Sequence, residues 1–327
     1  MSIQLQHAIR FFIGLFSLAF GAGINPAMAA DYPVKPLHII VPFAPGGSTD
    51  VLARIISETF NQRLGQPALV ENRPGASTIV GTESVARAAP DGYTLLLTSS
   101  SYTVNPVINK RARYDPTREM QPVYLLVTVP HILAVSATAP IKSVSELVAL
   151  AKSKPGSLNY ASSGIGTSTH LEAEMFKRMA AVDITHVSYN GAGPAINDVM
   201  SGQVQMIFGS LAALMPGVQA GKLRPLGVTI KAQLSALPEL QPIASMGLPG
   251  YVVSDWLGLL APAKIDAATL SRLTDALDKS FADSKFVARL TDLGFTIAAL
   301  PPAQFLTMLR NDPLAQVARD AAIQLAD

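Results

Sequence analysis

The sequence predicts an α/β protein built as two similar halves, and three observations support this. Short apolar runs alternate with longer segments of helical periodicity, the pattern of parallel strands covered by helices. A succession of strand, glycine turn and capped helix recurs in both halves, without a fixed repeat length. At 327 residues, the chain is also longer than one hydrophobic core usually requires.

The individual elements follow from the spacing of apolar residues. Strands are predicted at short runs rich in Val, Ile and Leu, namely Leu37–Val41, Leu69–Glu71, Thr94–Thr98, Ile132–Val135, Asn159–Ala161, Ile184–Val187, Met206–Phe208 and Pro225–Val228. Helices are predicted where apolar residues recur every three or four positions, namely Asp50–Leu64, Ile79–Arg87, Val144–Lys154, Ser168–Ala180, Pro194–Ser201, Leu211–Ala220, Ala267–Ala282 and Pro302–Leu309.

Two segments are predicted to connect the halves. In the segment Pro122–Pro130, the strand-like run Val123–Val127 leads into the second set of strands. The segment Leu237–Pro262 contains four prolines and is predicted to be an irregular return linker. We therefore expect one lobe at residues 30–130 plus 255–327 and a second at residues 131–254.

Composition excludes several classes of function. The chain has 25 basic and 23 acidic residues without a basic run, so nucleic acid is not an expected partner. It has no cysteine, which excludes disulfides, thiolate metal sites and cysteine nucleophiles. Its five histidines show no zinc-like spacing. We expect no metal and no cofactor.

The N-terminus predicts export. Met1–Arg10 carries one Arg and no acid, Phe11–Phe20 is apolar, and Ala27-Met28-Ala29 has the small-residue pattern of a cleavage site. An uncleaved membrane anchor is the alternative, but this apolar run is short for a bilayer span. We expect residues 1–29 to be a signal peptide cleaved near Ala29, and no later segment is apolar for long enough to cross a membrane.

The most informative turn is Pro42–Asp50, directly after the first predicted strand. Gly46 and Gly47 are followed by hydroxyl and carboxylate residues that can begin a helix. A turn of this kind presents unpaired backbone N–H groups at the positive end of the helix dipole, where anions bind.

A second turn of the same construction lies at Ser162–His170. Thr169 and Glu172 have the spacing of a capping box, so an ordinary capped turn is the alternative. The segment lacks the third glycine of a dinucleotide fingerprint, and it lacks the final glycine of a nucleophile elbow. The segment therefore matches neither of these two enzyme motifs, and it is a candidate anion site.

Two more polar turns follow predicted strands, His186–Ala195 and Thr98–Ser101. The first has Pro194, which suits the first position of a helix. Ligand groups gather at the carboxyl ends of strands in α/β sheets, so all four turns could line one crevice. Hydroxyls and backbone amides dominate these turns, whereas Lys and Arg are nearly absent. This chemistry favours reversible anion binding over catalysis, and we expect no enzyme activity.

Asp50 and His170 each have two interpretations. Asp50 could contact a ligand through water, but a carboxylate in a first helical turn usually stabilises the turn itself. His170 could bond a ligand oxygen or fill a structural position, and the sequence favours neither.

Longer motifs then carry a resemblance to a known family. They occur in order along nearly the whole chain that follows the signal peptide, at Val41–Asp50, Val70–Ala76, Ala89–Leu95, Tyr160–Leu171, Val187–Ala195 and Trp256–Pro262. Together they resemble the Bug-type receptors, the substrate-binding proteins of tripartite tricarboxylate transporters. The resemblance implies a two-lobed periplasmic-binding-protein fold of the type II kind. Each lobe would be a mostly parallel sheet flanked by helices, with the ligand cleft between the lobes.

The resemblance also implies the function and its site. The receptor would be periplasmic and monomeric, would close on a dicarboxylate, amino acid or aromatic acid, and would deliver it to inner-membrane transporter subunits. A ligand-sensing partner of a periplasmic signalling protein is the alternative. The expected ligand-binding residues are Phe43, Gly46, Gly47, Ser48, Asp50, Ser99, Ser100, Ser163, Gly164, Thr167, Ser168, His170, Asn190 and Gly191.

Overall fold

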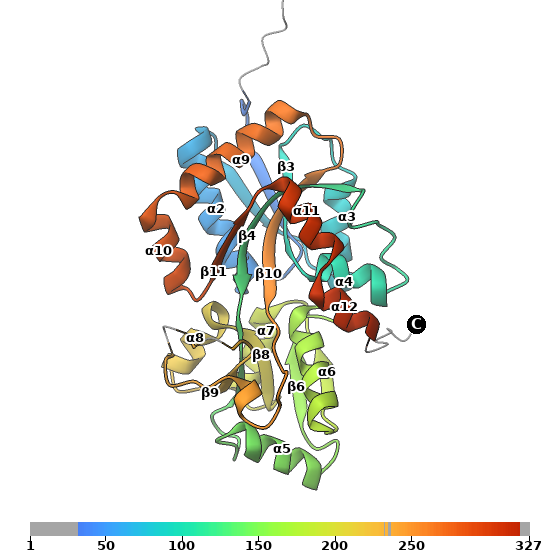
Figure 1. The fold of residues 1–327 in the computed structure, drawn as a ribbon, viewed down its shortest axis with the longest axis vertical. Helices are drawn as coiled ribbons and strands as arrows, with labels where there is room; N and C mark the ends of the chain where they lie inside the picture. The colour runs from blue at the N-terminus through green and yellow to red at the C-terminus, as the bar shows by residue number, and fades with distance from the viewer. Residues whose placement is uncertain (1–31, 232, 235–236, 321–327) are drawn as a thin grey trace, which may run out of the picture. The chain divides into compact units, whose positions relative to one another are not determined.

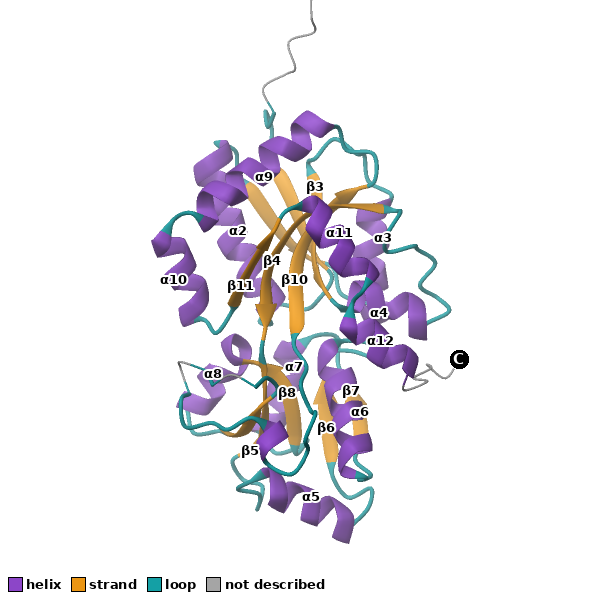
Figure 2. Ribbon diagram, in the orientation of Figure 1, coloured by secondary structure: helices purple, strands orange, loops and turns teal. Residues whose placement is uncertain are grey.

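The computed structural model describes residues 32–231, 233–234 and 237–320. The predicted signal peptide, residues 1–29, lies outside the described residues. From Lys35 onward the chain forms one unit. This unit contains two separate sheets, each flanked by helices (Figures 1 and 2).

The first sheet has six strands and is completed by chain from both ends of the unit. In order across the sheet these are β11 (Thr296–Leu300), β4 (Met120–Val129), β10 (Asp255–Pro262), β3 (Thr94–Ser99), β1 (Leu37–Val41) and β2 (Ala68–Asn72). Strands β1, β2 and β3 are parallel, and β10, β4 and β11 pair antiparallel. The helices on this sheet are α2 (Ser48–Leu64), α3 (Ile79–Ala86), α9 (Ala267–Phe281) and α11 (Pro302–Arg310).

The second sheet has five strands from the middle of the chain. Their order is β7 (Thr185–Ser188), β6 (Asn159–Ser162), β8 (Met206–Ser210), β5 (His131–Ser136) and β9 (Leu223–Val228). Strands β6, β7 and β8 are parallel, whereas β5 is antiparallel to both of its neighbours. The helices of this half are α5 (Val144–Ser153), α6 (Ser168–Ala180), α7 (Ala192–Met200) and α8 (Leu211–Gln219).

The two-lobed α/β fold class is confirmed, with the difference that each sheet is mixed rather than mostly parallel. Parallel neighbours occur where a helix crosses between strands, as α2 does between β1 and β2. Strand β4 instead continues through Pro130 directly into β5, so the chain passes from one sheet to the other without a crossover helix. Both β4 and β5 therefore pair antiparallel with their neighbours in their own sheets.

The largest correction concerns Leu237–Pro262, which was expected to be irregular throughout. Residues 255–262 form β10, which lies between β3 and β4 inside the first sheet and is buried along its whole length. Pro262 is the last residue of the strand, so its missing N–H affects the ladder only at its end. Further elements that were not expected are α4 (Ser101–Ile108), α10 (Ser284–Asp292) and β11, whereas α12 (Pro313–Asp320) lies within the C-terminal helix expected at Leu309–Asp327.

Both sheets bury side chains on two faces, with the alternation that a strand imposes. In β4, Tyr124 stacks on Phe281 of α9, and its neighbour Leu125 packs in the cluster that contains Phe305 of α11. In β5, Ile132 and Leu133 likewise belong to different apolar clusters. Both sheets are thus packed on two faces, and the candidate site lies largely at the carboxyl ends of their parallel strands.

Candidate functional site

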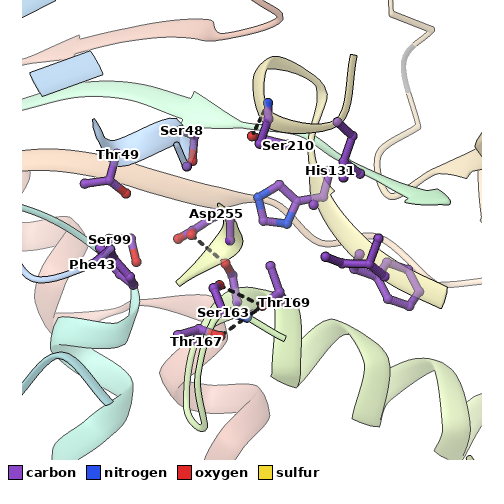
Figure 3. A pocket seen from close by; sticks show the side chains of 18 of the residues that line it. Phe43, Ser48, Thr49, Ser99, His131, Ser163, Thr167, Thr169, Ser210 and Asp255 are labelled. Carbon is purple, nitrogen blue, oxygen red and sulfur yellow. Dashed lines mark hydrogen bonds between the residues drawn. The ribbon is translucent and has the colours of Figure 1, made fainter. Parts of the chain in front are cut away.

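A cavity lies where segments of both sheets meet, and Figure 3 shows its lining side chains. Its walls come from the β1–α2 turn, the end of β3, the start of β5, the β6–α6 turn, α7, the β8–α8 junction and the start of β10. The predicted site residues that line it are Phe43, Gly47, Ser48, Ser99, Ser163, Thr167 and Ser168. Half of the predicted set is therefore brought together here.

Helix α2 begins at the cavity without a side-chain cap. Its N-cap is Gly47, which has extended backbone angles and no capping hydrogen bond. The backbone amides of Ser48 and Thr49, both in the lining, have no hydrogen-bond acceptor among the described residues. These N–H groups are available at the positive end of a 17-residue helix.

Asp50 holds the shape of the β1–α2 turn. Its carboxylate accepts hydrogen bonds from the Gly46 amide at 3.2 Å and from the Asn72 side-chain amide at 3.0 Å. The Arg54 guanidinium adds an ion pair at 3.1 Å. The side chain is buried and does not line the cavity, so the structural interpretation of Asp50 is the one that the contacts favour.

Helix α6 also begins at the cavity without a side-chain cap, because its N-cap Thr167 uses its hydroxyl elsewhere. That hydroxyl donates to the Gly164 carbonyl at 2.6 Å, within the turn. The capping box expected for Thr169 and Glu172 is wrong. Thr169 accepts from the Ser163 amide at 3.0 Å instead, and Glu172 pairs with His131 of β5.

His170 supports the β6–α6 turn and does not line the cavity. Its Nδ1 accepts from the Gly166 amide at 3.2 Å, and its ring stacks on His186 with centroids 4.4 Å apart. Burial lowers the pKa of His170 to about 4, so the ring is neutral at physiological pH. A neutral ring is what the hydrogen bond from Gly166 requires.

The β7–α7 turn lies against the β1–α2 turn. The Ala44 amide donates to the Asn190 carbonyl at 3.1 Å. At Gly191 the backbone has φ +136°, and a Cβ there would lie 2.7 Å from the Cβ of Ala44, so only glycine fits. The N-cap of α7 is Gly191 itself, and the helix has no side-chain cap. Pro194 is the third helical residue rather than the first.

Asp255 is a buried acid that the sequence analysis missed. It accepts hydrogen bonds from the Ser100 amide at 3.1 Å, the Trp256 amide at 2.8 Å and the Ser168 hydroxyl at 2.6 Å. The carboxylate therefore lies at the N-terminus of α4 and links it to α6 (Figure 3). The amide of Ser100, a predicted ligand group, is already used within the chain.

The sequence analysis also did not predict the pairing of His131 with Glu172. Nδ1 of His131 lies 2.7 Å from Oε2 of Glu172, and both side chains are almost fully buried. Burial alone would lower the pKa of His131, but the adjacent Glu172 carboxylate raises it above its ordinary value. Burial in turn raises the pKa of the Glu172 carboxyl. Of the two side chains, only His131 lines the cavity.

The remaining lining residues complete the walls. Ser210 caps α8 by accepting from the Ala213 amide at 3.3 Å. Ile207, Phe208 and Leu214 supply an apolar wall. The predicted site residues outside the lining are Gly46, Asp50, Ser100, Gly164, His170, Asn190 and Gly191. Gly164 and Asn190 border a smaller neighbouring pocket that also includes Phe43 and Ser163.

The arrangement suits an anion better than a reacting group. Three helices, α2, α6 and α7, direct uncapped N-termini to one cavity. Within the described part of the chain, no group of three or more His, Cys, Asp or Glu is arranged to hold a metal ion. Within the same part, no helix is long and apolar enough to cross a membrane.

Comparison with known proteins gives the family. The family model described as the tripartite tricarboxylate transporter family receptor matches residues 52–323. A UPF0065 protein of Pseudomonas sp. strain P51, from the tcbD–tcbE intergenic region, is 35% identical over 298 residues, which are 90% of this chain and 89% of the relative.

Solved structures agree with this match. The periplasmic binding protein BugD has a TM-score of 0.86 and 30% identity, covering 90% of this chain and 99% of its own. A Rhodopseudomonas palustris protein solved with adipate has a TM-score of 0.87 and 30% identity, with the same coverage. MatC of that organism, with bound malate, has a TM-score of 0.83 and 29% identity over 89% of this chain and 99% of its own. The chain therefore belongs to the family of tripartite tricarboxylate transporter receptors, as its resemblance to the Bug-type receptors predicted.

Proposed function

We propose that the protein is a periplasmic receptor that captures a small organic carboxylate between its two lobes and delivers it to a tripartite tricarboxylate-type transporter. The observation that carries this proposal is the convergence of the uncapped N-termini of α2, α6 and α7 on one cavity. Backbone amides at a helix N-terminus bind carboxylates without a basic side chain.

The expected energy of these contacts is sufficient. A hydrogen bond to a charged group contributes about 1.5–3 kcal/mol, and a helix dipole adds about 0.3–1 kcal/mol. Several such contacts, reduced by the cost of ordering the ligand, reach the ~8 kcal/mol of micromolar affinity. Adipate and malate in the two Rhodopseudomonas palustris relatives are ligands of the proposed class.

We further propose that binding involves opening and closing of the lobes, at residues 30–130 plus 255–327 and 131–254. Two hydrogen bonds between described residues join these segments near the cavity, from Ala44 to Asn190 and from Ser168 to Asp255. The cavity that they border is small, about 40 Å³, and its lining is largely buried. We therefore expect these two hydrogen bonds to open when a carboxylate enters.

A thermal-shift screen of the mature chain against a panel of carboxylic acids tests the binding step. A ligand that binds only the folded state raises Tm as its concentration rises, by about 2.7 kcal/mol of added stability at 100 times Kd. We expect at least one small acid to do so. A panel of dicarboxylates, amino acids and aromatic acids without any effect would contradict the proposal.

Delivery needs a separate test in cells. Uptake of the radiolabelled ligand is expected to fall when the gene for this receptor is deleted and to recover when it is restored. If uptake is unchanged while a transcriptional response to the ligand is lost, the protein serves a signalling partner instead.

A further inference from the structure

His131 is a basic side chain in the cavity that the helix N-termini do not account for. It is 2% exposed and is the only Lys, Arg or His in the described lining. Its imidazole points into the space bordered by Ser48, Asp255 and Ser210 (Figure 3). A buried basic group in an otherwise neutral or acidic lining needs a physical reason, because removing it from water is costly.

The two ring nitrogens of His131 have different surroundings. Nδ1 is 2.7 Å from Glu172, whereas Nε2 has no hydrogen-bond partner among the described residues. The hydroxyl of the buried Tyr251 donates to the backbone carbonyl of Glu172 at 2.9 Å, whereas the side-chain Oε1 of Glu172 has no hydrogen-bond partner among the described residues. A carboxylate at Nδ1 favours the doubly protonated ring, in which Nε2 is a donor.

We infer that His131 is a specificity-determining residue whose Nε2–H binds a second oxygen of the ligand, so that the receptor selects organic acids with an acceptor at both ends. This rests on the proposed function, in which the first carboxylate binds at the N-termini of α2, α6 and α7. The apolar wall of Ile207 and Leu214 faces the carbon chain between the two ends. Glu172 acts through His131 as a positioning residue.

The charges of the lining support this selection. Asp255 is the only acid in the described lining, and three donors already occupy its oxygens. No second anion site is made from Lys or Arg there. A second carboxylate would therefore be buried without a partner unless His131 supplies the donor, and an unpaired charge is strongly disfavoured.

Matched pairs of acids test the inference by calorimetry on the mature chain. The pairs are succinate with butyrate, adipate with hexanoate, and terephthalate with benzoate, so that only the second carboxylate differs. In the pair that fits the cavity, we expect the dicarboxylate to bind about 10- to 100-fold more tightly than the monocarboxylate, as one charge-assisted hydrogen bond would give.

Two variants are designed to remove the Nε2–H donor of His131 while keeping the fold. Glu172→Gln lets Nδ1–H donate to an amide oxygen and leaves Nε2 as a bare acceptor. His131→Asn keeps a partner for Glu172 but places no donor in the cavity. In both variants we expect the preference for the dicarboxylate over its matched monocarboxylate to fall to within about threefold. His131→Gln, whose amide nitrogen replaces Nε2, should keep part of the preference.

The outcomes are distinct. Equal affinity within every pair for the unmodified protein, or a preference that survives both Glu172→Gln and His131→Asn, would overturn the inference and leave the proposed function intact. If no acid binds at all, the proposed function fails and the inference with it. Far-ultraviolet circular dichroism and Tm show whether each variant is folded, and the unmodified protein carries the test even if one is not.

Discussion

Three helices whose N-termini meet at the cavity and three that lie away from it begin in different ways, although α3 and α11, outside the cavity lining, also lack a side-chain cap. Helices α5, α9 and α10 begin with side chains that cap them, Ser143, Asp266 and Asp283, which accept from backbone amides at 2.9–3.1 Å. Helices α2, α6 and α7 begin at Gly47, Thr167 and Gly191, and none of these provides a cap. Replacing a capping side chain by alanine costs about 1 kcal/mol, and by glycine only a few tenths. The N–H groups left without a cap at the cavity are available to a ligand.

Helices α4 and α8 show two intermediate solutions. Helix α4 receives its anion from elsewhere in the chain, since Asp255 of β10 accepts from the Ser100 amide. Helix α8 is capped by Ser210, whose side chain is itself part of the cavity lining. The backbone amides at these helix N-termini therefore find their acceptor in the N-cap side chain, in a distant residue, or in neither.

The largest effect is expected where a distant residue supplies the anion. Asp255→Ala would leave the buried amides of Ser100 and Trp256 without an acceptor, at about 1–3 kcal/mol each. We expect the free energy of unfolding in urea to fall by about 3–5 kcal/mol. Asp255→Asn is the matched control, because its oxygen can accept both amides while its NH₂ donates to Ser168, and it should cost much less. Equal losses in the two variants would contradict this account.

The next largest effect is expected at the uncapped N-terminus of α2, where two substitutions of Ser48 distinguish its backbone amide from its side chain. Proline is favoured at the first helical position, and Gly47 has extended angles that permit a following proline. Ser48→Pro should therefore preserve α2 but remove one amide from the cavity, weakening carboxylate binding by about 10- to 100-fold. Ser48→Ala, which keeps that amide, should change affinity less.

A proline at a capped helix provides the control for this experiment. Ala267→Pro places the same residue at the first position of α9, after Asp266, where the side chain is exposed and far from the cavity lining. We expect its ligand affinity to match that of the unmodified protein in the same titration. A loss as large as that of Ser48→Pro would mean that proline acts through helix stability and not through the amide.

The sequence was sufficient for features set by local pattern. Alternating apolar runs predicted both sets of parallel strands, and the glycine and hydroxyl residues of the β1–α2 and β6–α6 turns predicted where the cavity would lie. These signals are contained within short stretches of chain. The type of each turn is decided by neighbouring residues, so no tertiary information is needed.

The residues missed at the cavity depend on pairing between distant segments. Asp255 meets the Ser100 amide across 155 positions, and His131 meets Glu172 across 41. The proline-rich approach to β10 concealed a central strand, although its Trp-Leu-Gly-Leu-Leu run is apolar throughout. A lone acid or histidine beside an apolar strand has no local signature of function, because its partner is decided by which strands become neighbours.

The smallest effect is expected at the helices that cap themselves. Asp266→Ala and Ser143→Ala each remove a cap hydrogen bond, from the Thr269 and Glu146 amides respectively. We expect each to lower the free energy of unfolding by about 1 kcal/mol, with carboxylate affinity unchanged in calorimetry. Stability and binding would then be controlled at different helix N-termini of the same fold. A loss of affinity in either variant would break the distinction, because it would mean that the capped helices also determine the geometry of the cavity.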